Sequence, residues 1–343
     1  VPVLQEVRRR ADRQEVLDRR IRSQDAPHHR HVLALVPADH ALPYVVRHRA
    51  GVDPEVIEPP VPRIGEGRAV RAAGEGSGRL GGERIEVASL VAPNSDAHVY
   101  NPSPADARKL AEAKAVFVNG LGFEGWLDRL VKASGTKAPT VVVTKGIKPI
   151  VRAAGGHTHD HGSLGGHPRV DPHAWQSVAN VKVYATNIRD GLIAADPAGK
   201  AAYEANAAAY LEKLDALDTE VRDTVAKIPA ERRRILTTHD AFGYFAASYG
   251  IQMVAPQGVS TESEPSAKDV AALITQIKTK KISGVFMENV TDPRLIQRIS
   301  AETGAKGGGT LYSDALTDAK GPAPTYIDLI RHNIRTLSSA LTS

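Results

Sequence analysis

Short apolar runs alternate with amphipathic stretches from residue 81 to the end of the chain, in two blocks separated by two long helical patterns. Short apolar or β-branched runs predict strands, and apolar residues spaced three or four apart predict helices. In the first block the pattern predicts strands at 84–91, 115–119 and 140–144 and helices at 104–113 and 124–134. In the second block it predicts strands at 234–239, 251–256, 282–288 and 309–313 and helices at 241–249, 266–280, 292–303 and 325–341. The alternation indicates an α/β fold with parallel sheets.

Two helical patterns, 177–195 and 198–227, lie between the blocks, and Asp196 and Pro197 separate them because proline ends a helix. The second pattern has a steady apolar spacing of three or four, at Tyr203, Ala207, Tyr210, Leu214, Leu217, Val221 and Val225. About 30 residues of helix span roughly 45 Å, which is longer than one small lobe. We therefore expect two lobes of (β/α)4 type, 81–175 and 230–343, and a helical connection over 176–229 that contains one long rigid helix.

Residues 1–80 differ from the rest in composition. They hold 14 Arg and no Lys, 8 of the 22 prolines and a single aromatic residue, Tyr44. A packed core is not expected from such a tract, which is typical of a disordered or basic extension. It also has the composition of a G+C-rich gene translated in the wrong frame, and this is the hypothesis we favour. The first block has fewer strands and helices than the second, as expected if the N-terminal lobe is incomplete.

Charge and composition exclude several classes of protein. The formal net charge is +5, and 14 Arg against 11 acidic residues place +3 of it in residues 1–80, so the remainder is close to neutral. Nucleic acid is therefore not an expected partner. No run approaches the roughly 20 apolar residues of a membrane helix, and we find no signal-peptide pattern. With no cysteine, disulfides and lipid-anchoring thiols are excluded, and any metal must be held by His, Asp or Glu.

Four side chains are candidate metal ligands. His98, His239 and Asp314 stand at or just beyond the ends of predicted strands, and His173 follows Asp171 and Pro172 in a loop. The carboxyl ends of parallel strands share one crevice, so the first three are expected to meet there. A single histidine is more often a core or capping residue, but three imidazoles and one carboxylate form a set suited to tetrahedral zinc. A Gly-rich loop carries four further histidines, His157, His159, His161 and His167.

The residues around these candidates resemble a known family, the zinc- and manganese-specific solute-binding proteins of bacterial ABC importers. The matching segments are 95–106 (SDAHVYNPSPAD), 119–126 (NGLGFEGW), 171–175 (DPHAW), 237–245 (TTHDAFGYF) and 310–316 (TLYSDAL). The resemblance extends from about residue 81 to the C-terminus. It implies two α/β lobes joined by a long helix, for which 198–227 is the candidate, and a metal held between the lobes.

The resemblance also implies roles for particular residues. The metal ligands would be His98, His173, His239 and Asp314. Manganese receptors of the family typically have a carboxylate where His239 stands, so the resemblance implies a receptor of the zinc type. The histidines at 157–167 would capture zinc weakly or receive it from a periplasmic zinc metallochaperone, or else form a flexible solvated loop. We expect a periplasmic monomer that delivers Zn²⁺ to an ABC permease.

Several alternatives remain open. Asp171, Asp240 and Glu288 are candidates to orient the imidazoles, or are helix caps and surface carboxylates. A manganese receptor or a metal-dependent adhesin would share the fold. A zinc-dependent hydrolase would need an open coordination position and a general base, for which Glu288 is the one candidate. Because four protein ligands saturate a tetrahedral ion and no HExxH or GxSxG motif is present, we expect the protein not to be an enzyme.

Overall fold

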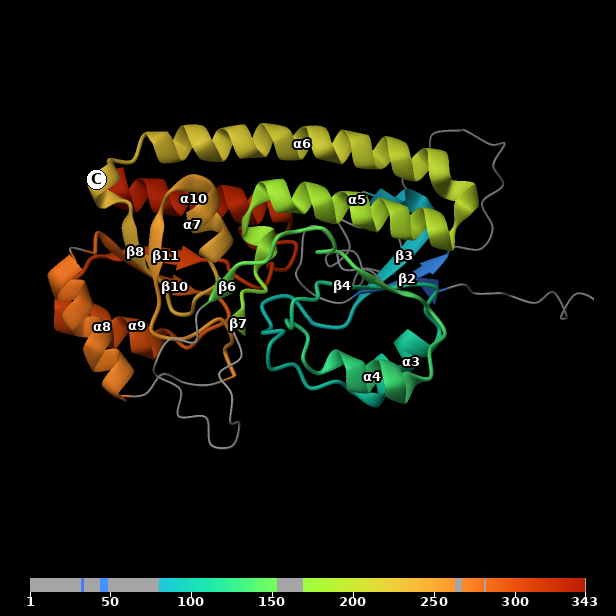
Figure 1. The fold of residues 1–343 in the computed structure, drawn as a ribbon, viewed down its shortest axis with the longest axis horizontal. Helices are drawn as coiled ribbons and strands as arrows, with labels where there is room; N and C mark the ends of the chain where they lie inside the picture. The colour runs from blue at the N-terminus through green and yellow to red at the C-terminus, as the bar shows by residue number, and fades with distance from the viewer. Residues whose placement is uncertain are drawn as a thin grey trace, which may run out of the picture. The chain divides into compact units, whose positions relative to one another are not determined.

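The computed structural model describes residues 32–33, 44–48, 80–152, 169–262, 267–280 and 282–342. These residues form two main sheets with helices on both faces (Figure 1). Helices α3 (Pro104–Ala111) and α4 (Leu127–Ser134) lie on one face of the first sheet, and α5 (Val178–Ala195) lies on the other. The layers confirm the α/β fold that the alternating pattern predicts.

The first sheet contains β1 (Val32–Leu33), β2 (Tyr44–His48), β3 (Ile85–Ser89), β4 (Val116–Val118) and β5 (Thr140–Val142). Strands β4 and β5 are parallel, whereas β2 runs antiparallel to β1, β3 and β4. The expectation of a parallel sheet is therefore wrong at β2, and the pattern predicts no strand before residue 84. The short run Tyr44-Val45-Val46 has the aromatic and β-branched residues that suit a strand. The rest of the tract 1–79, expected to be disordered or read in the wrong frame, lies outside the described residues.

The second sheet is parallel throughout. Its strands are β8 (Arg234–Leu236), β9 (Gln252–Val254), β10 (Gly284–Glu288) and β11 (Gly307–Leu311), in the order β11-β10-β8-β9. Helices α7 (Gly243–Tyr249), α8 (Ala267–Lys280), α9 (Pro293–Thr303) and α10 (Tyr326–Thr342) connect and cover the strands. All eight elements lie where the sequence predicts them, within a few residues at each end, so the carboxyl ends of four strands meet along one edge.

Helix α6 (Lys200–Ala226) runs beside α5 and α10 (Figure 1). Near its start, Asn206 Nδ2 donates to the carbonyl of Leu80 at 3.1 Å, and near its end Glu220 accepts from Arg331 Nε of α10 at 2.8 Å. All seven apolar residues that the spacing predicts for its buried stripe are buried. The stripe explains why this helix stays packed along its whole length.

A small hairpin leads from the first sheet towards the site. Strand β6 (Val151–Arg152) pairs antiparallel with β7 (Arg169–Val170), and the short helix η2 (Ala174–Gln176) follows before α5 begins. The predicted auxiliary histidines, His157, His159, His161 and His167, lie between the two strands and outside the described residues.

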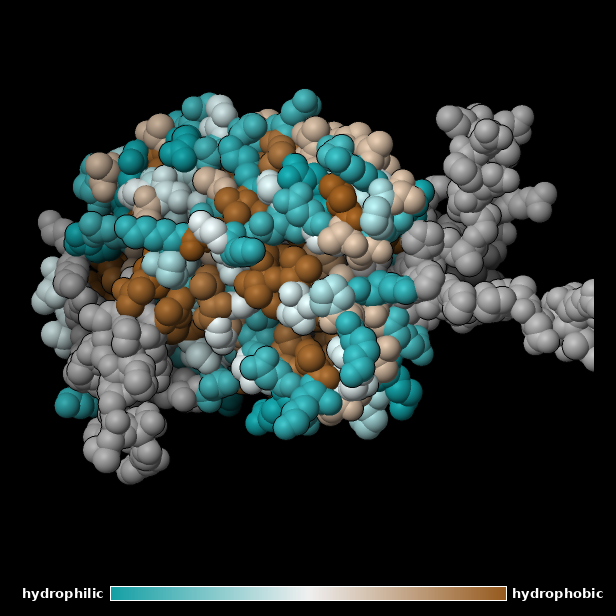
Figure 2. Space-filling model, turned by 45° about the vertical axis from the view of Figure 1, so that its right-hand side comes forward, coloured by the Kyte–Doolittle hydropathy of each residue, from teal (hydrophilic) through white to brown (hydrophobic). Residues whose placement is uncertain are grey.

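The surface is mixed, with apolar side chains gathered across the middle of one face (Figure 2). Among the described residues, the large apolar side chains that are exposed are Val99 (53%), Val142 (41%) and Val151 (54%). Val99 directly follows His98, so apolar surface adjoins the candidate site. None of the helices in the described ranges combines the length and the apolar character that a membrane crossing requires.

Candidate metal centre

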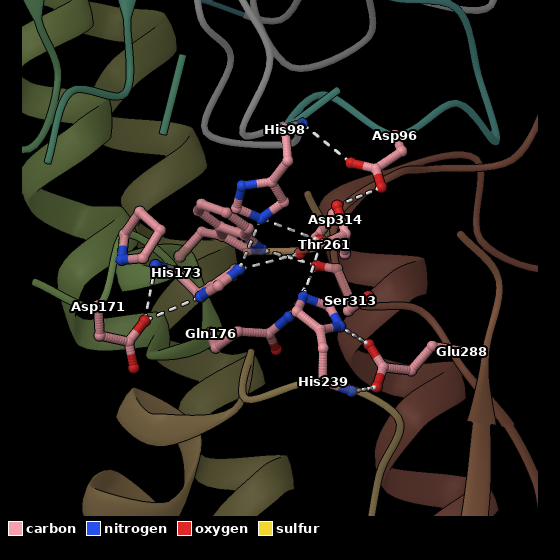
Figure 3. A network of polar contacts seen from close by, with 12 residues as sticks. Asp96, His98, Asp171, His173, Gln176, His239, Thr261, Glu288, Ser313 and Asp314 are labelled. Atoms are coloured by element: carbon pink, nitrogen blue, oxygen red, sulfur yellow. Dashed lines mark hydrogen bonds and ion pairs between the residues drawn. The ribbon is translucent and has the colours of Figure 1, made fainter. Parts of the chain in front are cut away.

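The four predicted ligand residues come together in one buried cluster. One donor atom from each of His98, His173, His239 and Asp314 lies within 4.8 Å of the others. The exposed fractions of these residues are 6% for His98, 2% for Asp314 and 0% for the other two. Figure 3 shows the imidazoles and the carboxylate pointing toward one another. Titratable groups are rarely removed from water so completely unless they are paired or bind a metal.

The fold brings these residues to one place from distant parts of the chain. His239 follows β8 and Asp314 follows β11, so both stand beyond the carboxyl ends of parallel strands of the second sheet. His98 lies in the loop after β3, and His173 immediately precedes η2. The site therefore takes its donors from loops associated with both sheets.

The donor atoms face one another at short distances. Oδ2 of Asp314 lies 3.0 Å from Nε2 of His239 and 3.7 Å from Nε2 of His98, and Oδ1 lies 3.5 Å from Nε2 of His173. The Nε2 atoms of His98 and His173 are 3.3 Å apart. These approaches to Asp314 lack hydrogen-bond geometry: neither of its oxygens accepts a hydrogen bond from a described residue. A cation at the centre would satisfy both oxygens and the three ring nitrogens together.

Two of the predicted orienting carboxylates, Asp171 and Glu288, lie beside imidazoles of the cluster. The Nδ1 atom of His173 lies 2.8 Å from Oδ1 of Asp171, and Nδ1 of His239 lies 2.6 Å from Oε2 of Glu288. The same carboxylates accept from the backbone: His173 N–H donates to Asp171 at 3.0 Å, and His239 N–H donates to Glu288 at 2.9 Å. The His173–Asp171 contact is a hydrogen bond, and it favours the tautomer in which Nε2 of His173 offers its lone pair to the centre. The His239–Glu288 contact is an ion pair without hydrogen-bond geometry.

A third carboxylate, Asp96, holds the remaining histidine, and the sequence analysis missed it. Its Oδ1 accepts the backbone N–H of His98 at 2.9 Å. The signal was present, because Asp96-Ala97-His98 repeats the spacing of Asp171-Pro172-His173. Asp240, the third predicted orienting residue, follows His239, and its backbone N–H donates to the carbonyl of Gly258 at 3.1 Å. Its role as an orienting carboxylate stays a prediction.

Aromatic side chains close the site on the side of the first sheet. Phe123 is 1% exposed, and its ring meets those of His98, His173 and Trp175 edge-on, with centroids 4.7, 6.1 and 5.0 Å away. Trp175 and Gln176 both donate to the carbonyl of Ser313, at 2.9 and 2.8 Å. The segment after His173 is thus tied to the residue before Asp314.

Phe123 is held by a turn with unusual backbone angles. Gly120, Leu121 and Gly122 have φ values of +80°, +56° and +80°, a conformation that only glycine adopts without cost. The buried Glu124 carboxylate stabilises the turn by accepting the backbone N–H groups of Asn119 and Gly120 at 2.7 and 3.1 Å. Burial raises the pKa of Glu124 to about 7, although these two hydrogen bonds oppose the increase.

Burial and neighbouring charges shift the pKa values of the residues in the cluster. Burial disfavours a charged His239, but the carboxylates of Glu288 and Asp314 outweigh it and hold the His239 pKa well above its usual range. Burial also opposes ionisation of Asp314, yet the neighbouring histidines keep its pKa well below normal. For His98, burial dominates and lowers the pKa to about 3. These shifts favour a charged His239 beside an ionised Asp314.

The family of the chain follows from comparison with known proteins. Residues 77–340 match the family described as zinc-uptake complex component A, periplasmic (ZnuA). The chain is 36% identical over 259 residues to iron-binding protein YfeA of Yersinia pestis, covering 76% of this chain and 80% of that protein. It is 33% identical over 264 residues to manganese-binding lipoprotein MntA of Halalkalibacterium halodurans, covering 77% and 83%. Related receptors thus carry names that refer to different metals.

Solved structures show the same fold. The periplasmic zinc-binding protein TroA of Treponema pallidum superimposes with a TM-score of 0.70 at 29% identity, covering 78% of this chain and 94% of that one. The manganese-bound periplasmic metal-binding protein of Candidatus Liberibacter asiaticus gives a TM-score of 0.67 at 29% identity, covering 77% and 94%. The chain therefore belongs to the ZnuA family of metal-binding solute receptors, which are components of ABC importers and not enzymes.

Proposed function

We propose that the chain is a zinc receptor, in which His98, His173, His239 and Asp314 bind one Zn²⁺ ion for delivery to an ABC permease. The observation that carries this proposal is the buried set of three imidazole nitrogens and one carboxylate, all facing one point. Four such donors complete a tetrahedral zinc site. Two carboxylates support it: Asp171 is hydrogen-bonded to Nδ1 of His173, and Glu288 lies 2.6 Å from Nδ1 of His239 as an ion-pair partner.

The donor set also bears on the choice among metals. Imidazole nitrogen suits zinc, while manganese is best held by carboxylates, carbonyls and water. Relatives named for manganese and iron show that the family fold serves other metals, so the donors at the site, and not the fold, support zinc. A manganese receptor is the second candidate. Because the relative YfeA is named as an iron-binding protein, the binding of iron(II) should be measured beside that of zinc and manganese.

Metal preference is tested by comparing two chains. Zinc binds more tightly than manganese to most sites, so a preference for zinc in the parent protein alone would say little. We therefore compare the ratio of the manganese and zinc dissociation constants in the parent with that in a His239→Glu variant, using competitive titration with metal-free protein. We expect the ratio to fall by about tenfold or more in the variant, because a second carboxylate replaces an imidazole.

Two results would refute the zinc assignment. One is a parent protein that binds manganese or iron(II) more tightly than zinc under the same conditions. The other is a ratio that does not change in His239→Glu, which would place position 239 outside the metal-binding set. Circular dichroism of both chains controls for folding.

The proposal extends to the oligomeric state, the location and the partner of the receptor. We propose that it acts as a monomer in the periplasm, by analogy with relatives named as periplasmic metal-binding proteins, and hands zinc to a membrane permease. The β6–β7 hairpin supports a link between the histidine-rich segment and the site, because β7 ends at Val170, three residues before His173. We propose that this segment collects zinc close to the ligand loop.

A further inference from the structure

His98 differs from the other three ligands in how it is held. The His173 and Asp314 segments are tied together through Ser313, and His239 is fixed by Glu288 on the neighbouring strand β10. His98 instead lies in the loop after β3, on the side of the first sheet, where Trp126 Nε1 donates to the carbonyl of Ala97 at 2.7 Å. Closing the metal site therefore requires the loop of His98 to be held against the segments that carry the other ligands.

Besides the contact between the Nε2 atoms of His98 and His173, two hydrogen bonds among the described residues join this loop to those segments. The backbone N–H of Asn94 donates to the carbonyl of Leu316 at 2.9 Å, two residues beyond Asp314. The hydroxyl of Thr261 donates to Oδ2 of Asp96 at 2.5 Å (Figure 3). Thr261 belongs to the loop after β9, whose residues Gln257 and Gly258 are hydrogen-bonded to the residues on either side of His239.

The carboxylate of Asp96 therefore makes two contacts with different consequences. One oxygen accepts the backbone N–H of His98 and the other accepts the Thr261 hydroxyl. Hydrogen bonds to a carboxylate are short and roughly twice as strong as neutral ones, and two donors fix its orientation. The result is a continuous connection from His98 through Asp96 and Thr261 to the segment that carries His239.

We propose that Asp96 and Thr261 form a positioning pair that holds His98 in the closed site and slows release of the metal. The proposal rests on the metal-binding function proposed above and goes beyond it, because neither residue is a ligand. When the hydrogen bond between Asp96 and Thr261 breaks, the Asn94–Leu316 bond still joins the start of the loop to its neighbour, but His98 is no longer tied to the segment of His239. His173, His239 and Asp314 keep their own supports. Release of the metal would then begin at His98.

The test measures zinc release from Thr261→Val, which removes the hydroxyl and keeps the volume of the side chain. Zinc-loaded protein is mixed with a range of concentrations of a chromogenic chelator, and the release rate is extrapolated to zero chelator. We expect release about tenfold faster than in the parent, in line with the usual effect of losing a group that orients a ligand. The association rate should stay within about twofold, since the change acts on the closed site.

Three controls separate positioning from a general loss of structure. Thr261→Ser restores the donor and should restore slow release. Thr219→Val removes a hydroxyl that donates to the carbonyl of Asp215 on the exposed side of α6, and should leave release unchanged. In an Asp96→Ala background, Thr261→Val should have no further effect, because the pair acts as a unit.

The outcomes distinguish this proposal from the one on which it rests. A parent chain without tight zinc binding would overturn the proposed function and this inference with it. Tight binding in the parent, with Thr261→Val releasing zinc within twofold of the parental rate, would overturn the inference alone. So would failure of Thr261→Ser to restore slow release, or an undiminished effect of Thr261→Val in the Asp96→Ala background.

Discussion

A His239→Ala variant should lose tight metal binding, with the dissociation constant for zinc rising by more than about 100-fold. Loss of a group that merely orients a ligand costs about 10- to 100-fold in affinity, so loss of a donor should cost more. His239 also lies between the carboxylates of Glu288 and Asp314, at 2.6 and 3.0 Å. Without the imidazole, two buried carboxylates face each other with no cation between them. Competitive titration against a chelator of known affinity measures the change.

The same removal can weaken the fold, because breaking a buried ion pair costs about 3–5 kcal/mol. A second variant, His239→Gln, keeps a polar side chain that can contact Glu288 and should lose metal binding while it stays folded. His332→Ala is the matched control: this histidine lies 3.0 Å from the carbonyl of Thr310 and contacts the ring of Tyr312, and it does not belong to the metal-binding cluster. Parental affinity in His239→Gln would show that His239 is not a ligand.

Zinc affinity should fall by about 100-fold between pH 8 and pH 6, with about one proton released for each ion bound near pH 7. Burial disfavours charge on His239, but Glu288 and Asp314 outweigh it and raise the His239 pKa well above its usual value, so the ring is protonated before metal binds. Zinc needs the lone pair on Nε2 and must displace that proton, which costs about tenfold in affinity for each pH unit below the pKa.

His98 and Asp314 should contribute little to this pH dependence. Burial lowers the pKa of His98 to about 3, so its ring is neutral across the range. Asp314 stays ionised because the neighbouring histidines hold its pKa well below normal in spite of its burial. Calorimetry in buffers of different ionisation enthalpy gives the number of protons released. Affinity that does not change with pH, or binding without proton release, would contradict this charge assignment.

Much of the fold could be predicted from local patterns. The buried stripe of α6 follows from its three-and-four spacing, and its seven apolar residues are all buried. Strands β8 to β11 follow from short apolar runs between helical patterns, and their parallel order places His239 and Asp314 at one edge. These features are local, or depend on general rules of connection, and so are visible in a single sequence.

Other features depend on contacts between distant segments. The antiparallel strand β2 was not predicted, because five residues in an Arg- and Pro-rich tract give little periodicity, and its pairing with β3 and β4 is decided by the sheet. The family match begins at residue 77, so most of that tract lies outside it, and its origin in a wrong reading frame stays a hypothesis. His173 follows no strand of a main sheet, so the rule that ligands meet at strand ends does not place it beside the other three.

The contacts that hold the ligand residues also divide into local ones, which the sequence indicates, and long-range ones, which it does not. The spacing Asp171-Pro172-His173 is local, and the same spacing at Asp96 and His98 could have indicated a second orienting carboxylate. The contact of Asp96 with Thr261 joins residues 165 positions apart, and nothing in the sequence indicates it.

The most direct test of the account is X-ray absorption spectroscopy at the zinc edge of protein loaded with one equivalent of zinc. We expect a first shell of nitrogen and oxygen at about 2.0–2.1 Å, with the outer-shell scattering of three imidazoles. The signal of one imidazole should disappear in zinc-loaded His98→Ala. A six-coordinate oxygen shell with fewer than two imidazoles in the parent protein would contradict the proposal that His98, His173, His239 and Asp314 hold the metal.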